Sequence, residues 1–251
     1  MGNLTDIYRQ LLKRFKPQGW WPLSELNFPV KEKDKDWPNY LKVNPKGTEA
    51  DFIKNWPRHL GVSPKTDNQI FEVIIGAILT QNTNWKNVEK AVYGLNSYKL
   101  VSIEKIKKIP IKKLAQIIRP SGYYNQKAER LKIISGFLMK NPIRRLKNLS
   151  IPELRKELLE IKGIGPETAD SIILYAFEKP IFVVDAYTRR IMSRLGYKEK
   201  GYDGLQQLFM EDLPKNTNLY KEYHALFVEL GKNFCKTKPL CISCVLKCCN
   251  G

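Results

Sequence analysis

The stretch LLEIKGIGPETAD (residues 158–170) joins two helical segments through Gly163 and Gly165, which are separated by one apolar residue, Ile164. Glycine permits the positive φ that a tight hairpin needs, and Pro166 suits the first position of the helix that follows. Backbone N–H groups at such a helix start, together with the helix dipole, can hold a phosphate. The pattern therefore predicts a helix–hairpin–helix that binds phosphate. An ordinary glycine-capped turn between two helices would give the same pattern.

A single carboxylate stands at a fixed place after this hairpin. Asp185 lies twenty residues beyond Gly165 and directly follows the apolar run of residues 181–184. We expect this run to be extended chain that leads into a helix. An aspartate in that place can be a simple N-cap. The hairpin upstream makes a simple N-cap a less complete explanation of this residue.

The charge of the chain favours a polyanion as partner. Its 43 lysines and arginines outnumber 25 acidic residues, which gives a net charge of +18 over 251 residues. Residues 103–147 concentrate this excess, with thirteen lysines and arginines against two acids. Such a surface suits a nucleic-acid backbone. A solubilising surface is the alternative explanation.

The cysteines point to a metal centre rather than to disulfides. All five lie within residues 235–251, at positions 235, 241, 244, 248 and 249. A disulfide framework would spread them along the chain. Four thiolates that include one C-x2-C pair can hold zinc or a [4Fe–4S] cluster, and spacing alone does not choose between the two.

Hydrophobic periodicity predicts helices over most of the chain. The expected helices span residues 4–15, 72–80, 85–95, 111–118, 126–139, 152–161, 167–177, 186–195, 202–212 and 219–234. Residues 23–70 are rich in Pro, Lys, Asp and Asn, and we expect a surface excursion there with one short helix near residues 49–55. No apolar run approaches the roughly 20 residues of a membrane span, and residues 1–15 lack a signal-peptide pattern. A cytoplasmic protein is expected, associated with the nucleoid in a prokaryote.

The order of hairpin, helix, apolar run and Asp185 resembles the helix-hairpin-helix (HhH-GPD) DNA glycosylase superfamily of the endonuclease III type. Three further segments are similar to that family: FEVIIGAILTQNT (71–83), GYYNQKA (122–128), and the helix from Tyr223 to Cys235 that leads into a cysteine loop. The resemblance covers residues 1–22 and about 70–249.

The resemblance implies an all-α, two-lobed fold with a C-terminal iron–sulfur loop. One lobe would be a six-helix barrel with the hairpin, residues 70–185. The other would combine residues 1–69 and 186–251, with 23–69 as a surface insertion. The partner would be double-stranded DNA with a damaged base, bound by a monomer. Gln81 would belong to the family's wedge loop, and the other expected DNA contacts are Lys162, Gly163, Ile164, Gly165, Lys236 and Lys238.

The resemblance also implies a [4Fe–4S] cluster held by four cysteines. The family spacing is C-x6-C-x2-C-x5-C, whereas here the first gap is one residue shorter. The last gap is one or two residues shorter, depending on the fourth ligand. Cys249 fits this gap better than Cys248, so the expected ligands are Cys235, Cys241, Cys244 and Cys249, with Cys248 as the alternative.

One departure from the family concerns the reaction type. Bifunctional members carry a lysine four residues after the first hairpin glycine, and that lysine forms a Schiff base with the sugar. Here this position is Glu167, which cannot form an imine. The chain therefore resembles the monofunctional branch, in which water is the nucleophile and Asp185 stabilises the cationic sugar.

Aromatic residues suggest the pocket for a flipped base. Trp20 and Trp21, followed by Pro22, and Trp85 after Gln81 resemble the 3-methyladenine glycosylase branch. Glu167 would also border this pocket. Stacking on indole suits a cationic methylpurine. One of the adjacent tryptophans is expected to pack in the core instead. His224 and Lys127 match family segments as structural or phosphate-contacting residues.

Three other functions remain open at this stage. A mismatch uracil or thymine glycosylase and an oxidised-base glycosylase that uses another amine are the alternatives within the family. A non-catalytic iron–sulfur DNA-binding module is the alternative from a different class, and the placement of Asp185 argues against it.

Overall fold

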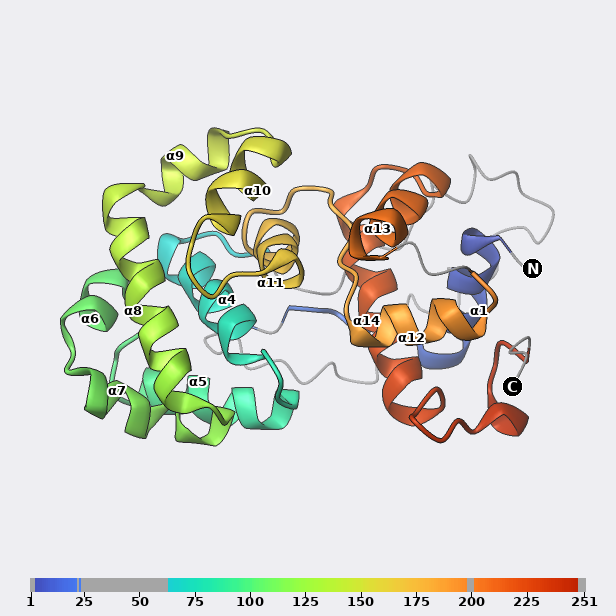
Figure 1. Ribbon diagram of the computed structural model, residues 1–251, viewed down its shortest axis with the longest axis horizontal. Coiled ribbons are helices and arrows are strands. Elements are labelled where there is room, and N and C mark those ends of the chain that lie inside the picture. The colour runs from blue at the N-terminus through green and yellow to red at the C-terminus, as the bar shows by residue number, and fades with distance from the viewer. Residues whose placement is uncertain (1–2, 22, 24–62, 198–200, 248–251) are drawn as a thin grey trace, which may run out of the picture. The chain divides into compact units, whose positions relative to one another are not determined.

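The computed structural model describes residues 3–21, 23, 63–197 and 201–247. Within these ranges the chain is helical and contains no β-strand (Figure 1). No helix among them is long and apolar enough to cross a membrane. The all-α class is thereby confirmed, and residues 181–184 lie outside the helices. The short helix expected near residues 49–55 lies outside the described residues.

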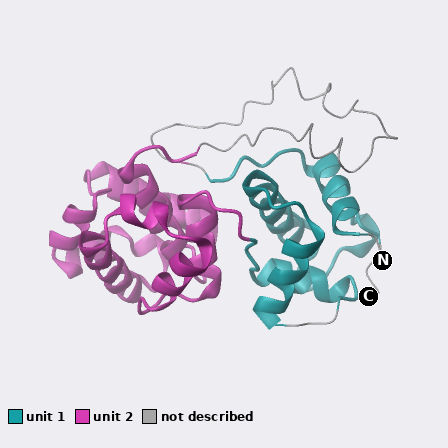
Figure 2. Cartoon of the chain, turned by 90° about the horizontal axis from the view of Figure 1, so that it is seen from above, with its two compact units in different colours: residues 1–22, 28–62, 182–251 teal, residues 23–27, 63–181 magenta. Residues whose placement is uncertain are grey.

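The chain folds as two compact units (Figure 2). Among the described residues, the first unit contains 3–21, 182–197 and 201–247, and the second contains 23 and 63–181. The division falls between Ile181 and Phe182, whereas the sequence suggested a boundary after Asp185. Asp185 therefore belongs to the first unit, together with the C-terminal helices.

The second unit is built around helix α4 (Asp67–Leu79), in which residues 70–79 are all buried. A helix that is apolar on every side is stable only inside a core. It begins at a capping box between Thr66 and Gln69 and packs against α5 (Trp85–Ser97) and α8 (Tyr124–Lys140). Helix α8 in turn carries α6 (residues 103–108) and α7 (residues 111–117), so α4 and α8 together form the centre of this unit.

Shorter helices complete this part of the second unit: α6 (Ile103–Lys108), α7 (Ile111–Ile117), η2 (Arg119–Ser121) and α9 (Ile143–Asn148). Helices α6 and α9 were not predicted. Each has six residues and buries only one or two side chains, Ile106 in α6 and Ile143 with Leu146 in α9. Two turns among many charges give too weak a hydrophobic period to detect.

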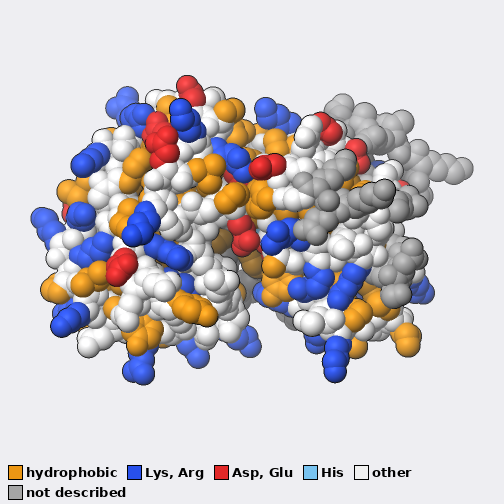
Figure 3. Space-filling view, viewed as in Figure 1, with side chains coloured by type: hydrophobic (Ala, Val, Ile, Leu, Met, Phe, Trp, Pro, Cys, Tyr) orange, Lys and Arg blue, Asp and Glu red, His pale blue; other side chains and the backbone are white. Residues whose placement is uncertain are grey.

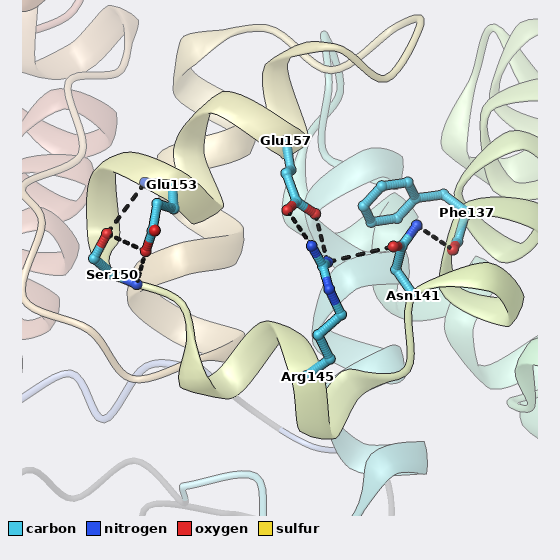
Figure 4. Close-up of polar contacts among 6 residues, drawn as sticks. All are labelled: Phe137, Asn141, Arg145, Ser150, Glu153 and Glu157. Atoms are coloured by element: carbon cyan, nitrogen blue, oxygen red, sulfur yellow. Dashed lines mark hydrogen bonds and ion pairs between the residues drawn. The ribbon is translucent and has the colours of Figure 1, made fainter.

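The hairpin of the second unit lies between α10 (Ile151–Leu159) and α11 (Pro166–Ser171), which continues into the π-helical turn η3 (Ile172–Ala176). A capping box between Ser150 and Glu153 starts α10 (Figure 4). Arg145 of α9 holds Glu157 of α10 through two hydrogen bonds of 2.8 and 2.6 Å (Figure 4). Both contacts fix where the first hairpin helix begins and how it lies on α9.

A buried ion pair joins the two hairpin helices. Arg155 of α10 donates from Nε and Nη2 to the two carboxylate oxygens of Asp170 in α11, at 2.8 and 3.3 Å. The Asp170 side chain has no exposed surface. A buried carboxylate is tolerated when a guanidinium binds it in this bidentate way, so the pair fixes the angle of the hairpin.

The first unit contains α1 (Leu4–Phe15), α12 (Ala186–Arg194), α13 (Gly201–Asp212), α14 (Thr217–Asn233) and η4 (Cys241–Ser243). An aromatic cluster forms its core, with Phe182 stacked on Phe209 at 3.9 Å and Tyr223 edge-on to both rings. The Tyr223 hydroxyl also donates to the Leu4 carbonyl, which holds α1 on α14.

Packing of the apolar run next to Asp185 is equally tight. Gln206 of α13 donates to the Phe182 carbonyl at 2.6 Å. Tyr187 of α12 lies so close to Gly231 of α14 that no side chain fits at that glycine. The segment that carries Asp185 is thus held by α13 on one side, and α12 lies directly against α14.

Candidate functional site

Asp185 is the N-cap of α12 and is almost fully buried. Its Oδ1 accepts a hydrogen bond of 2.7 Å from the Thr188 backbone N–H. Only 9% of the residue is exposed. The sequence left two roles open, an N-cap and a catalytic carboxylate, and the geometry shows that one oxygen serves the cap. The other oxygen, Oδ2, faces the Nε2 atom of His224 at 3.6 Å.

The surroundings of Asp185 favour its ionised form. Burial alone raises the pKa of a carboxyl group. The His224 imidazole and the Thr188 N–H oppose that effect and hold the pKa of Asp185 below its usual value. The result is a carboxylate that is charged at neutral pH in a site with little water, where its electrostatic effect on a nearby cation is strong.

Trp20 and Trp21, which the sequence treats alike, lie in different environments. Trp21 is 7% exposed and belongs to the core, as expected for one of the two. Trp20 is partly exposed, and its ring packs edge-on against His224 at 6.0 Å between centroids. The ammonium of Lys232 lies 5.6 Å from the centroid of the Trp20 ring. Trp20 is therefore the tryptophan of this pair that is available to a ligand.

Glu222 of α14 holds the loop that carries Trp20. Its carboxylate accepts hydrogen bonds from the backbone N–H groups of Gln18, at 2.6 Å, and Gly19, at 3.5 Å. Burial raises the pKa of Glu222 to about 7, although these two donors work against the rise. Sequence patterns do not reveal this role, because a glutamate on a long helix normally belongs to its solvent-exposed face.

The glycines of the hairpin have different roles. Gly163 has φ +91°, and a Cβ there would come within 2.8 Å of the Arg130 side chain. Gly165 is the extended N-cap of α11, and a Cβ there would meet nothing within 4 Å. Ile164 between them is buried, and its N–H donates to the Ile161 carbonyl, so it shapes the turn. Lys162 is exposed beside the turn.

Gln81, expected in a DNA wedge loop, is bound to the hairpin. Its Nε2 donates to the Gly163 carbonyl at 3.1 Å and to the Thr168 hydroxyl at 2.8 Å. Its Oε1 accepts from the guanidinium of Arg130, whose role was not predicted from the sequence. One amide side chain thus connects the loop after α4, the hairpin and α8.

Lys127 is a structural residue. It is fully buried, and its ammonium donates to the carbonyls of Leu79, at 2.8 Å, and Ser121, at 2.6 Å. Desolvation, with a smaller contribution from Arg130, lowers its pKa to about 8. The amine caps the C-terminal end of α4, where a positive charge is favourable.

The basic block of residues 103–147 is only partly available to a polyanion. Lys105 donates to the Lys99 carbonyl, and Lys132 donates to the carbonyls of Lys107 and Ile109. Lys127 is buried, whereas Lys105 is exposed and Lys132 is partly exposed, so these three residues differ in their access to a ligand. Figure 3 shows other lysines and arginines dispersed over the face that it draws. The charge excess therefore overstates the number of phosphate contacts.

Glu167 and Trp85 belong to the second unit, like the hairpin. Glu167 is exposed in the first turn of α11, where a carboxylate suits the helix dipole. Trp85 begins α5, is partly exposed, and donates from its indole nitrogen to Glu89 at 2.8 Å. The predicted site residues are thus divided between the units, with Asp185 and Trp20 in the first.

The described part of the cysteine loop is tied to α12 by two arginines. Arg194 donates to the Cys235 sulfur at 3.2 Å, and Arg190 donates to the Cys235 carbonyl at 2.7 Å. Cys235 and Cys244 are buried, whereas Lys236 and Lys238 are exposed. Among the described residues no three potential ligands gather as a metal site. Cys248 and Cys249 lie outside those residues.

Comparison with known proteins identifies the family. The model of the HhH-GPD superfamily of base excision DNA repair proteins matches residues 75–215. A putative DNA repair glycosylase of Methanocaldococcus jannaschii is 49% identical over 185 residues, which cover 70% of this chain and 83% of the relative. The chain therefore belongs to the HhH-GPD superfamily. Within it, the chain is a DNA glycosylase of base excision repair, as the motif resemblance implied.

Solved structures agree with this assignment. A 3-methyladenine DNA glycosylase of H. pylori bound to 1,N6-ethenoadenine is 34% identical, with a TM-score of 0.61, covering 73% of this chain and 92% of that one. A trapped covalent intermediate of endonuclease III with DNA is 26% identical, also with a TM-score of 0.61, covering 72% and 83%. The endonuclease III-like fold is therefore confirmed.

The different roles of the two glycines lead to a stability prediction. Gly163→Ala should lower the free energy of unfolding by roughly 1–3 kcal/mol, because it forces a side chain into a positive-φ position and against Arg130. Gly165→Ala is the matched control and should leave stability nearly unchanged. Urea titration of both variants measures the difference. Equal losses for the two would contradict the described hairpin.

Proposed function

We propose that this protein is a monofunctional glycosylase that flips a damaged base out of duplex DNA and removes it by hydrolysis, with Asp185 as the catalytic carboxylate. The observation that carries this proposal is the buried carboxylate of Asp185, which His224 and Thr188 hold in its ionised form. Cleavage of an N-glycosidic bond creates positive charge on the sugar. A fixed anion in a dry site stabilises that charge without having to reorganise.

The two carboxylate oxygens of Asp185 have different neighbours, which supports a catalytic role for this residue. Oδ1 is committed to the Thr188 N–H, so the orientation of the carboxylate is fixed by the start of α12. Oδ2, which lies 3.6 Å from Nε2 of His224, would stabilise the sugar cation and orient the attacking water. That water would add to the sugar carbon as the base departs with the bond electrons, and the protein would form no covalent bond to DNA.

The proposed substrate is an alkylated purine. Trp20 and Trp85 are partly exposed aromatic residues, and either can stack on a flipped base. The similarity to a 3-methyladenine glycosylase, at 34% identity, supports this class. A purine methylated at N3 or N7 carries positive charge on its leaving group, so it needs little help from an acid. Trp21, being buried, would support the pocket wall rather than contact the base.

Contacts with the DNA backbone are proposed for the hairpin and for the cysteine loop. The turn at Gly163 and Gly165 would bring backbone N–H groups close to a phosphate, with Lys162 beside it. Lys236 and Lys238 are exposed and would add charge from the loop. Gln81 would reach the duplex only by giving up its bonds to Gly163 and Thr168.

We also propose that Cys235, Cys241, Cys244 and Cys249 hold a [4Fe–4S] cluster. The donor set fits, because such clusters take four thiolates and Arg194 already presents a positive charge to the Cys235 sulfur. The cluster would hold the loop that carries Lys236 and Lys238. Anaerobically purified protein should be yellow-brown and contain about four iron atoms per chain. Colourless protein with stoichiometric zinc and no iron would refute this assignment.

The catalytic assignment is tested by Asp185→Asn. Asparagine can still accept the Thr188 N–H as an N-cap, so the fold should be retained. Loss of the charge should reduce single-turnover base release by on the order of 100-fold or more. Binding to undamaged duplex, measured by fluorescence anisotropy, should stay nearly the same. Wild-type turnover in this variant would show that another residue stabilises the sugar.

The hydrolytic mode is tested by borohydride trapping on duplexes that carry alkylated purines, 1,N6-ethenoadenine, mismatched uracil or thymine glycol. No covalent adduct should form, because Glu167 lacks an amine and the amine of Lys127 is buried between two carbonyls. Strand breaks should appear only after alkali. Efficient trapping would overturn the monofunctional mode, and release of uracil or thymine glycol alone would overturn the substrate class.

A further inference from the structure

His224 of α14 is a buried polar residue next to the proposed catalytic carboxylate. It is 5% exposed, and its Nε2 lies 3.6 Å from Oδ2 of Asp185. Trp20 packs edge-on against its ring at 6.0 Å. The imidazole is covered by protein, and its neighbours include Asp185, itself only 9% exposed, and Trp20, which is partly exposed. Any effect of His224 on the reaction must therefore pass through these two residues.

The two oxygens of Asp185 are oriented by two different helices. The N-terminus of α12 binds Oδ1, and His224 of α14 faces Oδ2. A carboxyl group this deeply buried tends to take up a proton unless donors or positive charge oppose that tendency. The backbone donor on Oδ1 also serves the helix cap, and the imidazole lies against Oδ2, while the Thr188 side chain favours the ionised form as well.

We infer that His224 is a positioning residue, which orients the Asp185 carboxylate and keeps it ionised, and thereby sets the lowest pH at which the enzyme removes bases. This inference rests on the proposed role of Asp185. It assigns to His224 an effect on the pH range of the reaction, which a residue of purely structural importance would lack.

Other titratable groups lie near Asp185 and His224, and the experiment must distinguish their effects on the pH dependence from that of His224. Glu222 lies two residues earlier on α14, binds the loop that carries Trp20, and has a pKa of about 7. Lys232 lies over the Trp20 ring, and the hydroxyl of Tyr223 is bonded to the Leu4 carbonyl. Of these, Glu222 titrates nearest to neutral pH, so the experiment must include its uncharged variant.

The test is the pH dependence of single-turnover base release by His224→Gln and His224→Leu, on dimethyl-sulfate-treated duplex and on duplex with 1,N6-ethenoadenine. Removing a group that lowers the pKa of Asp185 raises that pKa, so the carboxylate is protonated at a higher pH as the medium is acidified. The acidic limb should move up by about one pH unit, which is on the order of tenfold slower release below the limb. Glutamine keeps a donor without charge, so its shift should be smaller than that of leucine.

Two variants provide controls. Tyr220→Phe removes a buried hydroxyl one turn earlier on the same helix and should leave the acidic limb in place. Introducing His224→Leu into a Glu222→Gln background should still move the limb, because the shift belongs to Asp185. If the limb stays fixed in both His224 variants while Asp185→Asn is inactive, the inference is overturned and the role of Asp185 stands. If Asp185→Asn retains activity, the proposed function itself fails.

A spectroscopic measurement covers the case in which the His224 variants do not fold. The chain has two histidines, His59 and His224, so their ring nitrogen NMR signals can be told apart. A His59→Gln variant assigns the remaining signals to His224, and these should change in Asp185→Asn relative to the wild type. Unchanged His224 signals in that variant would also overturn the inference.

Discussion

The first unit depends on keeping the almost fully buried carboxylate of Asp185 ionised. Asp185 would take up a proton if burial acted alone, so its charge survives only through fixed donors at known places. One of these groups is the N-terminus of α12, which donates to Oδ1, and the other is the imidazole of α14, which lies 3.6 Å from Oδ2. The tight contact between Tyr187 and Gly231 holds those helices together. Packing between α12 and α14 is therefore also what determines the electrostatics of the site.

In the second unit, the main constraint is that the tight turn of the hairpin is held in one conformation. Gly163 adopts a backbone conformation that other residues avoid, and its carbonyl is bound by Gln81 while Arg130 fills the space beside it. The Arg155–Asp170 pair fixes the helices on both sides. Because Gln81 contacts the hairpin directly, a movement of the loop after α4 would change the hydrogen bonds that hold the turn. The conformations of the loop and of the hairpin are therefore coupled through this one amide.

The helices and the two decisive motifs were predictable from the sequence because local signals specify them. Periodicity located the ten long segments to within a few residues, and the glycine spacing located the hairpin. Helices α6 and α9 were not predicted, because a helix of two turns buries too few side chains to produce a detectable hydrophobic periodicity. The difference in burial between Trp20 and Trp21 depends on tertiary packing. Two identical neighbouring residues give no sequence signal that would distinguish them. Arg130 and Glu222 were missed for the same reason, since their partners are more than 45 residues away.

Helix α14 shows why buried polar residues mark this site better than hydrophobic ones do. Residues 219–228 are buried almost without interruption, so the helix has no solvent face from which charged residues would normally project. Glu222 and His224 nevertheless lie inside, where an unsatisfied polar group costs about 1–3 kcal/mol. Each has a partner that the first unit needs, the Trp20 loop for Glu222 and Asp185 for His224. An apolar helix of the same length would pack at least as well, so stability does not explain these residues. Their positions are explained by the need to hold an aromatic side chain and a carboxylate at the same place.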